Sequence, residues 1–240
     1  KVLAERIPAH FRASDNTWFG FSNRARVIVY NKEKVKPEDV ATYESLADPR
    51  NKGKVCTRSG SHPYNLSLFG SMIVRHGVEQ TEKLLSGYVA NMARAPKGGD
   101  TDQIRAVASG ECGVALTNSY YLVRLMRSDK PEDKEVASKV AMVWPNQDGA
   151  GVHMNLAGGA VARHAPHKEI AVQFLEYLAT DEAQRYFANG NNEWPVVKGV
   201  DAGNETLASL GSFKADTMPT DQMAARAADA QKLLDKVGYK

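Results

Sequence analysis

Two adjacent tyrosines, Tyr120 and Tyr121, follow the apolar run 112–116 and three polar residues. An apolar run that ends in polar residues predicts a strand whose C-terminal end reaches a ligand cleft, as in open α/β sheets. Phenol oxygens are hard donors and, once deprotonated, suit a hard, highly charged cation such as ferric iron. Such a cation stabilises phenolate against tyrosine's ordinary pKa of about 10 and displaces the protons as it binds. Alternatively, one ring packs in the core and the other caps it through a hydroxyl hydrogen bond.

A short loop of small residues lies between a predicted strand and a predicted helix. The loop comprises Ser59, Gly60 and Ser61. Pro63 suits the first position of a helix, and a helix N-terminus presents N–H groups and a positive dipole end to an anion. The loop could therefore hold carbonate, phosphate or a carboxylate, with Tyr64 beside it. It could equally be only a turn. Ser61 beside His62 also suggests a nucleophile, but no Gly-x-Ser-x-Gly elbow is present.

Two arginines, Arg24 and Arg26, precede a β-branched run. Arginine offers fixed, bidentate donors to an oxyanion. An arginine here could neutralise an anion that completes the coordination sphere of a metal. The alternative is a pair of surface arginines that flank a strand.

The composition excludes several classes of function. The 240 residues include 31 basic and 28 acidic side chains, for a net charge of +3, and this mixture gives no support for binding nucleic acid or a membrane. A hydrophobic content of 42% is that of an ordinary soluble globular protein, with one large domain or two modest lobes. No apolar run reaches the roughly 18 residues of a transmembrane helix, and no signal peptide opens the chain. Six scattered histidines lack the spacing of a zinc enzyme.

The only two cysteines, Cys56 and Cys112, each lie at the edge of a predicted strand. They cannot form a four-thiolate metal site, and no Cys-x-x-Cys spacing occurs. Neighbouring parallel strands could bring them together as a disulfide, which would imply an oxidising compartment. The alternative is two buried thiols.

Strand and helix patterns alternate, which predicts α/β layers with mostly parallel strands. The predicted strands are 26–30, 55–58, 112–116, 140–144 and 158–162. The predicted helices cover 63–73, 84–89, 100–109, 167–188 and 221–237. Asp100 and Gln103 have the spacing of a capping box, so Asp100 is expected to cap its helix, although it could also face the cleft.

Several segments, in their order along the chain, resemble a bacterial periplasmic ferric-ion-binding protein, the substrate-binding component of an iron ABC transporter. These segments are 22–32, 56–67, 98–103, 110–121 and 179–184. The Tyr-Tyr and Ser-His-Pro-Tyr motifs together are specific to the family, whereas Asp-Glu-Ala-Gln marks solute-binding proteins more broadly.

The resemblance implies the type II periplasmic-binding-protein fold, with two α/β lobes joined by hinge strands. We expect residues 1–30 and 156–240 to form a partial first lobe that includes the C-terminal helices. Residues 31–155 would form the lobe with the tyrosines, with crossings near 26–32 and 143–158. The chain is expected to start after about eighty residues of the family pattern, which would leave the first lobe and the iron site incomplete.

The resemblance also implies a ligand set. Phenolates of Tyr64, Tyr120 and Tyr121 would bind Fe(III). A synergistic carbonate or bicarbonate would bind near Arg24, favoured over Arg26, while Asn118 and the loop Ser59, Gly60 and Ser61 would line the same cleft.

The implied function is that of a non-catalytic, monomeric carrier in the periplasm that delivers ferric ion to an ABC permease in the inner membrane. One alternative is a receptor for a small anion or organic solute on the same fold, with the tyrosines stacked on or hydrogen-bonded to the ligand. The other is an enzyme that uses Ser61 or a cleft carboxylate.

Overall fold

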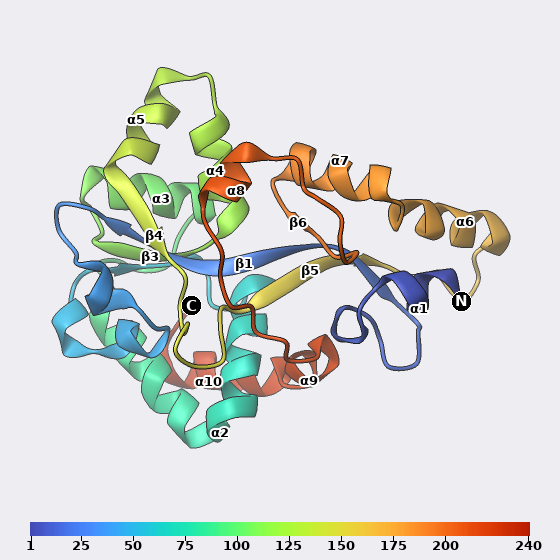
Figure 1. The fold of residues 1–240 in the computed structure, drawn as a ribbon. Helices are drawn as coiled ribbons and strands as arrows, with labels where there is room; N and C mark the ends of the chain where they lie inside the picture. The colour runs from blue at the N-terminus through green and yellow to red at the C-terminus, as the bar shows by residue number, and fades with distance from the viewer. The chain divides into compact units, whose positions relative to one another are not determined.

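The computed structural model describes residues 1–240, which divide into two compact units (Figure 1). The first unit comprises residues 1–24, 154–212 and 217–221, and the second comprises residues 25–153, 213–216 and 222–240. The chain leaves the second unit after residue 153, inside the predicted crossing 143–158. The placement of the C-terminal helices in the first lobe is wrong for residues 222–240, which lie in the second unit.

The α-helices are α1 (Val2–Arg6), α2 (Pro63–Asn91), α3 (Asp100–Ser109), α4 (Ser119–Arg127), α5 (Pro131–Lys139), α6 (Lys168–Leu178), α7 (Asp181–Asn191), α8 (Glu205–Ser209), α9 (Thr220–Ala224) and α10 (Ala227–Val237). Short 3-10 turns are η1 (Ala9–Phe11), η2 (Pro37–Val40), η3 (Glu44–Ala47) and η4 (Pro49–Asn51). The strands are β1 (Phe19–Asn31), β2 (Val55–Cys56), β3 (Val114–Asn118), β4 (Val140–Val143), β5 (Met154–Gly159) and β6 (Trp194–Pro195). None of the helices combines the length and apolar character that crossing a lipid bilayer requires.

The six strands form one mixed sheet around the long strand β1, in the order β2-β3-β1-β4, with β5 and β6 also paired to β1. Helices accompany this sheet, so the predicted α/β class is confirmed. The expectation of mostly parallel pairing is wrong for β1, which pairs antiparallel with β3, β4 and β6. Two consecutive strands can pair in parallel only when a crossover connection joins them. In this protein α2 and α3 form such a connection between the parallel strands β2 and β3.

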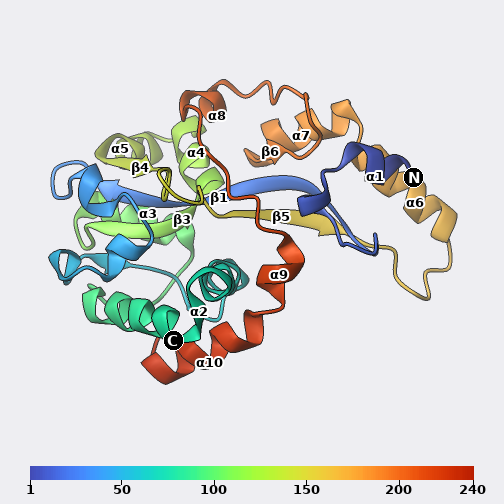
Figure 2. The same cartoon turned by 60° about the horizontal axis from the view of Figure 1, so that its bottom comes forward.

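The core of the second unit packs α2 and α10 against the inner faces of β1, β2 and β3. Figures 1 and 2 show α10 running along α2, where Ala230, Leu233 and Leu234 are buried with Phe69. This burial is why the C-terminal helix belongs to the second unit. The two helices predicted at 63–73 and 84–89 form one element with a kink at Gly77, whose φ of 79° favours glycine.

Helix α3 begins at Asp100 itself, whereas a helix with Asp100 as its N-cap would begin one residue later. Gly99 is the N-cap, and its N–H donates to Asp102 Oδ2 at 2.7 Å. The predicted capping role of Asp100 is therefore wrong, because Asp102 satisfies the N-cap N–H from the third helical position. The helix ends at Gly110, which has a φ of 82°.

The first unit has a smaller core that includes Leu3, Phe19 and Phe21. The single helix predicted at 167–188 is two helices, because Thr180 Oγ1 accepts from the N–H of Ala183 at 3.3 Å and starts α7. The apolar side chains of α6 are not all buried: Ile170 is 64% and Phe174 58% exposed. Hydrophobic spacing identifies a helical face but not what covers it.

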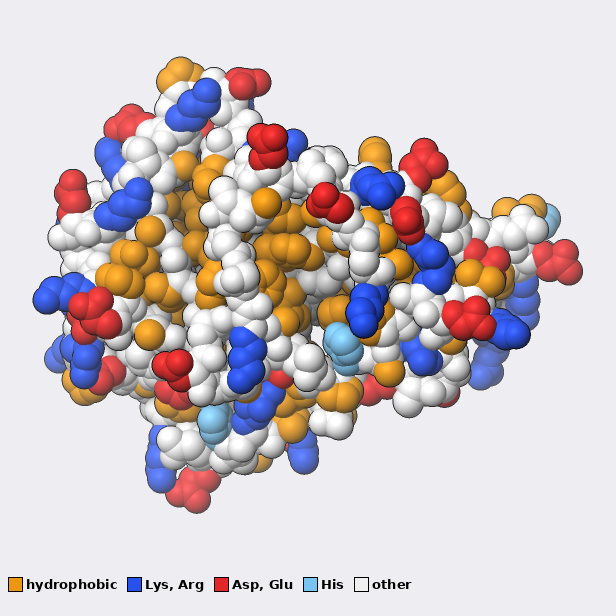
Figure 3. Space-filling view, viewed as in Figure 1, with side chains coloured by type: hydrophobic (Ala, Val, Ile, Leu, Met, Phe, Trp, Pro, Cys, Tyr) orange, Lys and Arg blue, Asp and Glu red, His pale blue; other side chains and the backbone are white.

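Lysine, arginine, aspartate and glutamate side chains mix on the molecular face in Figure 3. This agrees with the mixed charge expected from the sequence.

A disulfide joins Cys56 at the end of β2 to Cys112 just before β3. Both residues are buried, and β2 and β3 are neighbours in register, with Cys56 opposite Ala115. The bond therefore crosslinks the two parallel strands that lead into α2, by way of the Ser59–Ser61 loop, and into α4.

Replacing both cysteines, Cys56→Ala with Cys112→Ala, should destabilise the protein by up to about 4 kcal/mol, because the bond closes a loop with a sequence separation of 56. Urea unfolding followed by circular dichroism measures the change. The wild type in excess dithiothreitol, unfolded and refolded, should match the double variant. An unchanged midpoint in both would contradict a stabilising role for this bond.

Candidate metal centre

Three tyrosines converge within the second unit. Strand β3 ends at Asn118 and α4 begins at Ser119, so Tyr120 and Tyr121 lie in the first turn of α4. Their rings stack with centroids 4.3 Å apart. Tyr64, in the first turn of α2, places its hydroxyl oxygen 2.9 Å from that of Tyr120. Two helix starts therefore bring phenol oxygens from distant parts of the chain into direct contact.

Burial favours the neutral phenol form of Tyr120 and Tyr121. Burial is the largest cause that raises the pKa of Tyr120, and its hydrogen bonds with Tyr121 and Tyr64 raise it further. Burial also raises the pKa of Tyr121. A metal that binds here must therefore displace phenolic protons.

Three arginines surround the rings. The guanidinium carbon of Arg58 lies 5.0 Å from the ring centroid of Tyr64, and that of Arg124 lies 5.4 Å from the centroid of Tyr121. Arg26 lies 5.8 Å from the Tyr64 centroid. These positive charges interact favourably with the ring faces and would offset the charge of phenolates.

Sequence reasoning missed the contacts of Arg58 and Arg124 with the rings. Arg124 stands three residues after Tyr121 and four after Tyr120, so helical spacing could have revealed it. Arg58 belongs to the resemblance segment 56–67 but reaches Tyr64 through the loop, which no periodicity predicts.

A buried polar network lies directly behind the tyrosines. Asp100 Oδ2 accepts from Arg26 Nη1 at 2.6 Å and from the N–H of Asn118 at 2.7 Å. Arg26 also donates to Asn118 Oδ1 at 3.1 Å and to Asn65 Oδ1 at 2.8 Å. Arg26 Nε and Asn118 Nδ2 are buried donors without a hydrogen-bond partner.

The Ser59–Ser61 loop uses several of its polar groups internally. The N–H of Gly60 donates to the carbonyl of Lys240 at 3.3 Å, and Ser59 Oγ lies 3.0 Å from Ser61 Oγ. His62 Nδ1 accepts from the N–H of Tyr64 at 3.3 Å, and burial, helped by the charge of Arg58, lowers the pKa of His62. Because the N–H of Gly60 and the serine hydroxyls already have partners, the loop offers an anion fewer free hydrogen-bond donors than we expected from the sequence.

Arg24 lies in the first unit, whereas Arg26 lies in the second. Its Nη1 is 3.9 Å from the buried carboxylate of Glu193, which also accepts a hydrogen bond from Ser22 Oγ. The preference for Arg24 over Arg26 as an anion partner is not tested by these contacts and stays a prediction.

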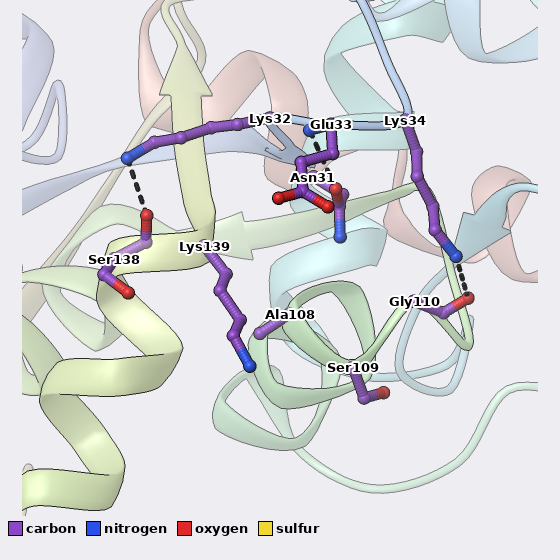
Figure 4. Close-up of a pocket in the computed structure, with 9 residues that line it drawn as sticks. All are labelled: Asn31, Lys32, Glu33, Lys34, Ala108, Ser109, Gly110, Ser138 and Lys139. Atoms are coloured by element: carbon purple, nitrogen blue, oxygen red, sulfur yellow. Dashed lines mark hydrogen bonds between the residues drawn. The ribbon is translucent and has the colours of Figure 1, made fainter.

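A hollow with a volume of about 380 Å³ lies at the C-terminal ends of α3 and α5 (Figure 4). Lys32 Nζ donates to the carbonyl of Ser138 at 2.8 Å, and Lys34 Nζ to that of Gly110 at 3.2 Å. These lysines thus satisfy carbonyls at two helix ends, a structural role. No group of three or more His, Cys, Asp or Glu side chains in the chain could hold a metal ion.

The chain is similar to several known bacterial proteins. Residues 6–220 match the family described as bacterial extracellular solute-binding protein. The chain is 46% identical over 240 residues to iron uptake protein A1 of Synechocystis sp. (strain PCC 6803), covering 100% of this chain and 66% of that relative. The chain therefore spans slightly less than two thirds of that relative.

Two solved structures are also similar. One is a Trichodesmium protein in complex with iron and citrate ligands, with a TM-score of 0.96, 51% identity, and coverage of 100% of this chain and 76% of that chain. The other is a ferric binding protein from Campylobacter jejuni, with a TM-score of 0.95, 36% identity and coverage of 100% and 76%.

The raised pKa of Tyr120 predicts a loss of stability in alkali. The folded state favours the neutral phenol, so this contribution is complete below the unfolded pKa of about 10 and is lost as the pH rises above it. Above pH 10 the unfolding free energy of the metal-free wild type should fall more steeply than that of Tyr120→Phe, by up to about 1.4 kcal/mol per pH unit. Urea titrations at a series of pH values measure the slopes.

Tyr186, which is 75% exposed in the first unit, provides the control. Tyr186→Phe should keep the wild-type slope. Equal slopes for the wild type and Tyr120→Phe would contradict the prediction.

Proposed function

The chain belongs to the bacterial extracellular solute-binding proteins, and from this premise we propose that it captures ferric iron through Tyr64, Tyr120 and Tyr121. The predicted resemblance to ferric-ion-binding proteins is confirmed by the relatives. The observation that carries the proposal is the 2.9 Å contact between the hydroxyl oxygens of Tyr64 and Tyr120, with Tyr121 stacked on Tyr120. A cation at this point would meet oxygens from two helices.

The donor chemistry supports Fe(III) as the cargo. Phenolates are hard, anionic oxygen donors, and a trivalent cation gains the most from them. Burial of Tyr120 lowers the local dielectric, which strengthens the attraction between metal and phenolate once the protons have left. Because three phenolates already balance the charge of ferric iron, the neighbouring Arg58 and Arg124 would offset the charge of an additional bound anion.

A carrier fits the site better than an enzyme. The hydroxyl of Ser61 contacts Ser59, whereas Nδ1 of His62 accepts from the N–H of Tyr64, so no base is placed on a serine nucleophile. We therefore infer a non-catalytic carrier in the periplasm that passes ferric ion to an ABC permease of the inner membrane.

An anion such as carbonate or bicarbonate is proposed to complete the coordination sphere. The unpaired buried donors Arg26 Nε and Asn118 Nδ2 support an acceptor in their vicinity. The same donors favour the second candidate function, a receptor that binds a small anion or an organic acid without iron.

Titration of the protein with ferric citrate should produce a visible phenolate-to-iron charge-transfer band. Tyr64→Phe, Tyr120→Phe and Tyr121→Phe should each weaken the band and lower the affinity for iron by roughly 10-fold or more, because each removes one anionic donor. Visible absorption during titration, with a competing chelator, measures both.

Tyr186→Phe again serves as the matched control and should retain the full band, because this exposed ring lies outside the second unit. Absence of the band in the wild type, together with calorimetric binding of bicarbonate or citrate alone, would refute the iron carrier and support the anion receptor.

A further inference from the structure

We propose that Asp100 is a positioning residue of the tyrosine site, whose buried carboxylate holds together the two chain segments that deliver the phenols. This inference rests on the proposed function, because it assigns Asp100 a role in iron capture. Asp100 is 0% exposed and stands at the first position of α3. Since Asp102 caps that helix, the carboxylate of Asp100 is available for contacts elsewhere.

The first segment held by Asp100 is the junction of β3 and α4. The N–H of Asn118, the last residue of β3, donates to Asp100 Oδ2 at 2.7 Å. Only Ser119 separates Asn118 from Tyr120. The bond therefore fixes the point where the strand turns into the helix that carries Tyr120 and Tyr121.

The second segment leads from β2 into α2. Asp100 Oδ1 accepts from Arg58 Nη1 at 3.2 Å, and the same guanidinium lies 5.0 Å from the ring centroid of Tyr64. Arg26 adds a second link, because it donates to Asp100 and also to Asn65, the neighbour of Tyr64. One carboxylate thus restrains both sides of the contact between the hydroxyls of Tyr64 and Tyr120.

The charges assign a supporting rather than a ligating role to Asp100. A fully buried carboxylate requires paired donors, and three donors already occupy this one. Without its charge, the guanidinium groups of Arg26 and Arg58 would repel each other beside the Tyr64 ring and move apart. Displacement of Arg58 would then disturb the position of the phenol.

Asp100→Asn tests the role, because it keeps the size of the side chain but removes the charge and one acceptor. In a ferric citrate titration, the affinity for iron should fall by roughly 10- to 100-fold, as for other groups that orient metal ligands, and the charge-transfer band should shift. A loss of stability alone would change the melting temperature without moving the band.

Asp133→Asn is the matched control. Asp133 accepts from Arg105 Nη2 at 3.0 Å and from Ser128 Oγ at 2.7 Å, at the end of α4 remote from the tyrosines. It should lower stability while the iron affinity and the band stay within about twofold of the wild type.

Arg58→Lys provides a second variant in case Asp100→Asn does not fold. The substitution keeps the positive charge and leaves the ion pair between Arg26 and Asp100 in place. A lysine ammonium, however, lacks the planar guanidinium that can bind the Asp100 carboxylate and lie over the Tyr64 ring at the same time. Its iron affinity should fall by roughly threefold or more, with a shifted band.

The outcomes separate this inference from the proposed function. Suppose that the wild type shows its normal band, and that Asp100→Asn and Asp133→Asn have the same iron affinity and the same band. This result overturns the positioning role of Asp100 and leaves the iron carrier intact. If Asp100→Asn does not fold, wild-type affinity and band in Arg58→Lys overturn it. Absence of the band in the wild type overturns both.

Discussion

The buried ion pair between Asp100 and Arg26 is the interaction on which the rest of the tyrosine site depends. A carboxylate that is 0% exposed and a guanidinium that is 2% exposed are stable only when the two charges are paired and supported by further hydrogen bonds. That constraint brings β1, the start of α3 and the end of β3 to one point, at distances of 2.6 and 2.7 Å from a single oxygen. Tyr64 lies at the start of α2, which follows β2, and the Tyr120–Tyr121 pair lies at the start of α4, which follows β3. These helix starts are therefore positioned by strands that are already held in place.

The tyrosines themselves show two opposed consequences of burial. Removal from water raises the pKa of Tyr120 and so favours its neutral phenol, whose oxygen lies within hydrogen-bond distance of the Tyr64 hydroxyl. The same low dielectric strengthens the attraction between phenolates and a trivalent cation. Under the proposed function, such a site would favour a strong Lewis acid over weakly charged metals, because the metal must compensate for the loss of the phenolic protons.

Much of the fold could be predicted where a pattern is local. The β-branched run of β1, the proline at the start of α2 and the Gly110 end of α3 all act through neighbouring residues, and each prediction was close. Errors arose where the partner is distant. The antiparallel pairing of β1 depends on where the chain enters the sheet, and the exposure of Ile170 and Phe174 depends on what covers α6. Hydrophobic spacing carries no information on either point.

The sequence by itself determined the chemistry available to this protein: adjacent phenols after a strand, another phenol at a helix start, and arginines close by. Side-chain type decides donor hardness and charge, and these properties do not depend on the fold. Only the tertiary structure decided which groups meet. Tyr64 and Tyr120 are 56 positions apart, and Arg26 and Asp100 are 74 apart, so no local rule relates them. Asp100 illustrates the difference, because its spacing suggested a helix cap, whereas the need to pair a buried charge made it the partner of two arginines.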